Sequence, residues 1–150
     1  MKLMFDLFKS EIIDSLKAPF VMSCIFKYNR LKLLKIIYQE TDEFLSDASI
    51  LRFAAKCGYL EIVRYLTEMG ASCTSDAMDS AALHGNIEIV KFLHLNRSEG
   101  CKRALHYAAS NGQFEVVKYL VENGLGMYYL HLSIAKTRSD QVRSYLLSIK

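Results

Sequence analysis

The sequence predicts an all-α solenoid built from stacked helix–turn–helix units, and three observations support this fold class. Gly58, Gly85 and Gly112 recur every 27 residues within similar stretches: AAKCGYLEIVRYL, AALHGNIEIVKFL and AASNGQFEVVKYL. A fixed interval of this length is typical of stacked repeat arrays. Two small residues precede each glycine and an apolar helical pattern follows it. The single proline and seven glycines leave little room for a disordered linker.

The clearest unit shows how each helix of a pair is predicted. In KRALHYAASN the small and apolar residues recur at helical spacing, on a narrow face. Gly112 then supplies the left-handed residue that ends a helix at low cost. QFEVVKYLVEN has a wider apolar face, which predicts a buried second helix that ends at Asn123-Gly124.

Equivalent positions in the three units predict the core and the solvated face. The alanine pairs before the glycines allow neighbouring helices to approach closely. We expect the aromatic residues at one position of the second helix, Tyr65, Phe92 and Tyr119, to pack in the core. Acid–base pairs such as Glu61 and Arg64 recur three residues apart, and such pairs belong to a solvated face.

Two degenerate units are expected to flank the three clear ones. The predicted array spans 18–150, with a degenerate unit at about 18–46, clear units at 47–73, 74–100 and 101–127, and a degenerate C-terminal cap at 128–150. Residues 1–17 form an amphipathic pattern and predict an N-terminal capping helix. Terminal units differ because their outer faces meet water. The Met1 start and the degenerate ends predict a complete small protein.

Composition and charge favour an intracellular globular protein. The chain has 150 residues, a net charge of +3 and 51% hydrophobic residues. No apolar run is long enough to cross a membrane, and the start has no cleavage site of a signal peptide. We expect a cytoplasmic location. The excess positive charge lies in the tail, at Lys136, Arg138, Arg143 and Lys150. The sequence lacks the basic stripe along one face that would predict a broad nucleic-acid-binding surface.

The stretch RALHYAASNGQFEVVKYLVENG resembles the ankyrin repeat. Leu105, His106 and Ala108 match the L-H-x-A of the signature T-P-L-H-x-A, with Arg103-Ala104 in place of Thr-Pro. The array is similar to the ankyrin arrays that are abundant in giant DNA viruses and amoebal genomes. If the protein is viral, the expected location is the host cytoplasm. Its period is shorter than the family's value of about 33 residues. The missing residues correspond to the β-hairpin finger, so we expect fingers that are trimmed or absent. In the family, the signature histidine, here His106, holds the turn between repeats by hydrogen bonds.

The resemblance implies a partner-binding surface on the concave face. The matching positions, which we call the candidate row, are Phe53, Lys56, Cys57, Ser75, Ser80, Leu83, His84, Lys102, Tyr107, Ser110 and Asn111. Aromatic anchors flanked by polar groups are typical of an interface centre.

Catalytic and metal chemistry is not predicted. Cys57 and His84 occupy one position in adjacent units, but stacked helices lie about 8–10 Å apart, too far for ligands of one ion. Reduced cysteines are expected in a chain without secretory marks. No nucleophile, phosphate-binding or acid–base motif is present. We therefore expect no enzyme activity, no metal and no cofactor.

The predicted function is non-catalytic protein–protein interaction. One version of this prediction is a viral protein that binds proteins of its host. The predicted partner is a protein; no small-molecule substrate or membrane is expected, and the chain is expected to be a monomer. One alternative is a structural protein that self-assembles. Another, less favoured, is nucleic-acid binding through the basic C-terminal tail.

Overall fold

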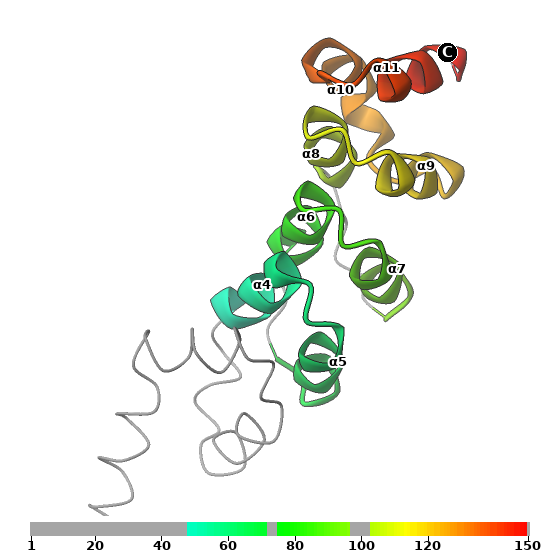
Figure 1. The fold of residues 1–150 in the computed structure, drawn as a ribbon. Helices are drawn as coiled ribbons and strands as arrows, with labels where there is room; N and C mark the ends of the chain where they lie inside the picture. Colours follow the sequence, from blue (N-terminus) through cyan, green and yellow to red (C-terminus); the bar gives the residue numbers. More distant parts are fainter. Residues whose placement is uncertain (1–47, 72–74, 97–102, 150) are drawn as a thin grey trace, which may run out of the picture.

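The structure is a computed structural model that describes residues 48–71, 75–96 and 103–149 (Figure 1). In these residues all regular structure is helical, and it is arranged as four consecutive helix pairs. The pairs are α4 (Ala48–Cys57) with α5 (Leu60–Glu68), α6 (Ser75–Leu83) with α7 (Ile87–Asn96), α8 (Ala104–Ser110) with α9 (Phe114–Glu122), and α10 (Leu130–Lys136) with α11 (Asp140–Ser148). The expected all-α helix–turn–helix solenoid is confirmed.

Each described pair lies within one of the predicted units 47–73, 74–100, 101–127 and 128–150. The boundaries of these units remain a prediction. The expected capping helix at 1–17 and the degenerate unit at 18–46 lie outside the described residues.

The helices stack in two columns (Figure 1). The inner column contains α4, α6, α8 and α10, and the outer column contains α5, α7, α9 and α11. The inner helices pack closely because each of α4, α6 and α8 buries its alanine pair completely: Ala54-Ala55, Ala81-Ala82 and Ala108-Ala109. A larger side chain at these positions would push adjacent helices apart, since protein interiors are close-packed.

The repeated glycines end the inner helices as the pattern predicts. Gly58, Gly85 and Gly112 adopt the left-handed conformation, with φ of 81°, 77° and 70°. The residue after each glycine donates its backbone N–H to a carbonyl five residues back, as in the bond from Asn86 to Ala81 O at 2.9 Å. This is the bond of a Schellman C-cap, and it requires the left-handed residue that glycine adopts without strain.

The residue after the glycine also joins consecutive units. The Asn86 amide donates to the backbone carbonyls of Ala55 and Lys56, at 2.7 and 3.0 Å. These carbonyls lie at the C-terminal end of α4, where a helix has no intrahelical donors left. Asn86 also lies against Gly58, where a Cβ atom would come within 3.0 Å of Asn86 Oδ1. The glycine therefore serves both the turn and the close approach of the next unit.

The outer helices bury one face and expose the acid–base pairs. Val63, Val90 and Val117 are completely buried, as the register predicts. The Glu61–Arg64 and Glu88–Lys91 pairs form at 3.9 and 3.0 Å with largely exposed side chains. Both features support the predicted division between core and solvated face.

The predicted core position of the outer-helix aromatics is only partly right. Tyr65, Phe92 and Tyr119 are half-buried and pack against the edge of the core. The Arg64 guanidinium lies 5.1 Å from the centre of the Phe92 ring. The Tyr119 hydroxyl is 2.8 Å from His94 Nδ1 on α7. Phe92 and Tyr119 therefore lie at the seams between successive outer helices, where solvent reaches one side.

The junction between α9 and α10 shows what replaces a hairpin finger. Gly124 and Gly126 are left-handed, and a single 3-10 turn follows, η2 (Met127–Tyr129). This junction contains no strand, in agreement with the expected loss of the finger. The two preceding junctions include 72–74 and 97–102, which lie outside the described residues. None of the helices in the described segments has the length and apolar character that a bilayer span requires.

Candidate functional site

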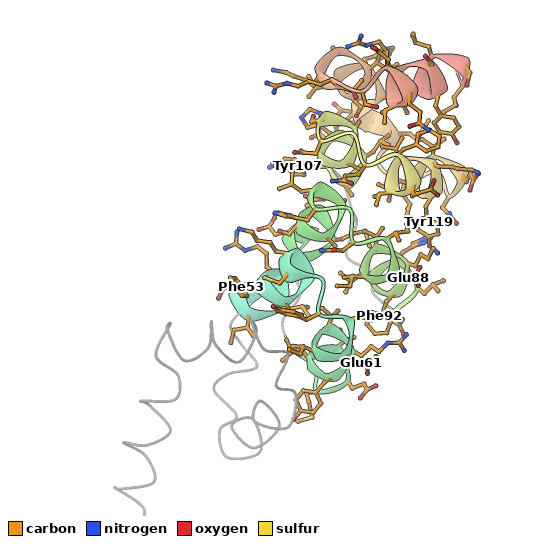
Figure 2. All side chains as sticks on the ribbon, viewed as in Figure 1. Phe53, Glu61, Glu88, Phe92, Tyr107 and Tyr119 are labelled. Atoms are coloured by element: carbon orange, nitrogen blue, oxygen red, sulfur yellow. The ribbon has the colours of Figure 1, made fainter. Side chains whose placement is uncertain are left out.

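The candidate row takes one helix-face residue from each of three inner helices. Phe53, Ser80 and Tyr107 occupy the same position of α4, α6 and α8. Phe53 is 38% exposed, although it is a large apolar side chain, and Ser80 and Tyr107 are half-buried. Figure 2 shows Phe53 and Tyr107 on the side of the inner column that faces away from the labelled outer-helix residues Phe92 and Tyr119. These residues therefore lie on one face that the outer helices do not cover.

Six further members of the row lie at the C-terminal ends of the inner helices. Lys56, Cys57, His84 and Asn111 are exposed, and Leu83 and Ser110 are half-buried. His84 Nδ1 lies 2.9 Å from the Ser80 carbonyl oxygen. In the next unit Asn111 donates to the Tyr107 carbonyl at 3.1 Å. Both contacts hold a polar side chain against the last turn of its own helix, so part of each group's hydrogen-bonding capacity is already used.

Two predicted members of the row lie outside this description. Lys102 belongs to the undescribed segment 97–102, and the side chain of Ser75, the first residue of α6, is not described. Their place in the row remains a prediction.

A polar cluster next to the row was not predicted from the sequence. The Arg103 guanidinium donates hydrogen bonds to the hydroxyls of Tyr107 and Tyr129, and these bonds raise the pKa of the arginine. Tyr107 belongs to the row, and Tyr129 comes from the turn before α10. The signal in the sequence was the arginine that replaces the first threonine of the repeat signature, but nothing in the pattern pointed to Tyr129.

Asp79 joins this cluster from α6. Its side chain is only 7% exposed, and its carboxylate accepts a hydrogen bond from the backbone N–H of Arg103. Oδ1 of Asp79 is buried without a hydrogen-bond partner among the described residues. Burial, together with the nearby charge of Asp76, raises the pKa of Asp79 from 3.8 to about 6, although Arg103 acts in the opposite direction. Asp79 therefore links α6 to the start of α8 at an electrostatic cost.

His106 occupies the equivalent position one unit later but makes a different contact. Its Nδ1 is buried and has no hydrogen-bond partner among the described residues. The ring lies 5.8 Å from that of Tyr107. Burial, with a smaller contribution from Lys136, lowers the pKa of His106. The family's hydrogen bond is not observed at Nδ1, and Asp79 is the residue that bonds the backbone of a following unit.

The described cysteine and histidines form no metal centre. Cys57 is exposed and unpaired, and partial burial raises the pKa of its thiol despite the neighbouring Lys56. Within 48–71, 75–96 and 103–149, no three or more histidine, cysteine, aspartate or glutamate residues come together in a way that could hold a metal ion.

The stacked helix pairs and the glycine turns define the class of the protein, an α-helical solenoid of repeated units. Comparison with family models then identifies the repeat. Two overlapping stretches, 51–94 and 78–121, match the family described as ankyrin repeats (many copies). The matched part of the chain, residues 51–121, consists of ankyrin repeats, and these lie on α4 to α9. No curated protein and no solved structure gives a significant match. Ankyrin repeats generally mediate protein–protein interaction.

Proposed function

We propose that this chain is a non-catalytic module that binds another protein through the candidate row on the concave face of the solenoid. The main support is the exposed Phe53, which stands on the same face as Tyr107 with the small Ser80 between them. Large apolar side chains beside polar groups are what an interface centre favours. The likeness to giant-virus arrays extends the proposal to a host protein as the partner, in the host cytoplasm.

The rigidity of the scaffold also supports binding. Schellman turns fix the end of each of α4, α6 and α8, and the bonds of Asn86 join the turn after α6 to the end of α4. A surface on such a scaffold is ordered before the partner arrives, so it loses little conformational entropy on binding.

The test is affinity capture from a lysate, with and without nuclease, with purified chain as bait. A Phe53→Ala variant is compared with Leu95→Ala, which removes an apolar side chain that is 78% exposed on the outer helix α7. Circular dichroism establishes that both variants are folded. The proposal predicts a discrete protein that survives nuclease, is retained by Leu95→Ala and is lost or weakened with Phe53→Ala.

Other outcomes would overturn the proposal. Capture that disappears with nuclease would indicate nucleic acid as the partner. Capture of the chain by itself, with a mass that grows with concentration in light scattering, would indicate self-assembly. Equal capture by both variants would show that binding does not use the candidate row.

A further inference from the structure

Charged residues divide unevenly between the two columns of helices. The inner helices, counted with Arg103 at the start of α8, carry four basic and two acidic residues: Arg52, Lys56, Arg103 and Lys136 against Asp76 and Asp79. The outer helices carry six acidic and four basic residues: Glu61, Glu68, Glu88, Glu115, Glu122 and Asp140 against Arg64, Lys91, Lys118 and Arg143. The described inner column is therefore net positive and the outer column net negative.

The basic residues of the two columns also differ in their partners. Three of the four basic residues of the outer helices, Arg64, Lys91 and Arg143, each form a salt bridge with an acid three residues earlier, whereas Lys118 forms none with a described residue. On the inner helices, Arg52, Lys56 and Lys136 are exposed. None of them forms a salt bridge with another described residue. Their positive charge is therefore available to an approaching partner.

Arg103 is the cation that lies beside the candidate row. Its side chain is exposed, and hydrogen bonding with the hydroxyls of Tyr107 and Tyr129 raises its pKa. A guanidinium has five N–H donors, and two single-hydroxyl acceptors leave donors for a further group. The group that matches a guanidinium in shape and charge is a carboxylate, which it binds with two parallel hydrogen bonds. Because Tyr107 is a member of the candidate row, this donor set adjoins the proposed interface.

The two acids of the inner column do not cancel this charge. Asp79 is buried and already accepts the backbone N–H of Arg103. Asp76 is exposed on α6 and makes the middle of the column less positive. The positive charge is therefore concentrated at two places: Arg52 and Lys56 on α4, and Arg103 and Lys136 beside α8 and α10.

We propose that the partner presents an acidic polypeptide segment to this face, with a carboxylate bound by Arg103 and further carboxylates attracted by the exposed lysines. This inference rests on the proposed function and adds the chemical class of the partner. Opposite charge across an interface accelerates association and excludes like-charged proteins. Carboxylates suit Arg103, and the exposed Phe53 offers an apolar contact within the same face.

The probe is fluorescein-labelled poly-L-glutamate, and binding to the full chain is followed by fluorescence anisotropy at low ionic strength. Arg103→Glu is compared with Lys118→Glu, which makes the same change of charge on the exposed face of the outer helix α9. We expect Arg103→Glu to weaken binding about tenfold, the effect of losing a hydrogen bond to a charged group, and Lys118→Glu to change it little. Added salt is expected to weaken binding by the wild type.

Lys56→Glu provides a second variant if Arg103→Glu does not fold, and the same loss is expected of it. Three results would overturn the inference: no binding of polyglutamate by the folded wild type, equal losses in the Lys118→Glu control, or tighter binding of single-stranded DNA of matched length than of polyglutamate.

Lysate capture with the same variants separates this inference from the proposed function. A partner that is lost with Phe53→Ala but fully retained by Arg103→Glu and Lys56→Glu would refute the acidic segment and leave the binding module intact. Failure to capture any protein would refute the proposed function itself.

Discussion

The buried carboxylate of Asp79 makes the stability of this protein depend on pH in an unusual direction. The perturbation is Asp79→Asn, which keeps an oxygen acceptor for the Arg103 N–H and removes the ionisable group. In the wild type the side chain is 7% exposed, and burial, followed by the charge of Asp76, raises the pKa of Asp79 from 3.8 to about 6. Between these two values the folded chain keeps a proton that the unfolded chain has released.

The sign follows from proton linkage. Stability changes with pH in proportion to the protons bound by the unfolded state minus those bound by the folded state. Here the folded state binds more protons between about pH 4 and pH 6, so the contribution of Asp79 to stability is largest below pH 4 and is lost as pH rises to 6. A shift of this size corresponds to a change of about 2–3 kcal/mol in the free energy of unfolding.

The assay is urea unfolding followed by circular dichroism at several pH values from 4 to 7. We expect the free energy of unfolding of Asp79→Asn, minus that of the wild type, to rise by about 2–3 kcal/mol across this range. His106 is present in both proteins, so its titration cancels in the difference. Glu115→Gln removes one exposed carboxylate of α9 and serves as the control for lost charge. A difference between Asp79→Asn and the wild type that is constant with pH would refute the raised pKa and the burial behind it.

Three further predictions concern unfolding in urea at neutral pH. Gly85→Ala should lower the free energy of unfolding more than Gly70→Ala. Both positions are left-handed, and the backbone strain common to both substitutions is about 1–2 kcal/mol, but only at Gly85 would the new Cβ meet a neighbouring side chain, that of Gln113. Equal losses of stability would contradict this packing. Phe92→Ala should lower the free energy of unfolding by about 2 kcal/mol, because the ring is half-buried and a fully buried phenylalanine contributes roughly 3–5 kcal/mol. A loss within the higher range would show that the ring is a full member of the core. Asn86→Ala should cost about 1–2 kcal/mol through its two bonds to the carbonyls of the preceding unit, and an unchanged midpoint would show that these bonds add no stability.

The repeat and its local structure were predictable because they rest on short-range patterns. The left-handed glycines, the helix on either side of each and the buried alanine pairs all follow from residues close together in the chain. The same pattern recurs in each of the three clear units, so the structure predicted for one unit applies to all three. The face of the inner helices that carries Phe53 and Tyr107 could also be predicted, because helical spacing determines which residues share a face.

The burial of the outer aromatics was harder to predict. Helical spacing placed Tyr65, Phe92 and Tyr119 on the apolar side of their helices, and they do pack against the core. How much solvent reaches them depends on the offset between successive outer helices. That offset brings Arg64 over Phe92 and His94 to Tyr119, and no pattern within one unit encodes it.

By itself, then, the sequence determined that this protein is a stack of helix pairs, where each inner helix ends and which small residues allow the helices to approach. Only the tertiary structure decided the electrostatics of the candidate site. Asp79 meets the backbone of Arg103, and Arg103 meets Tyr129, across the boundaries between units. Hydrogen bonds and desolvation act over a few ångströms in space, and residues about 25 positions apart reach that distance only when the units are stacked.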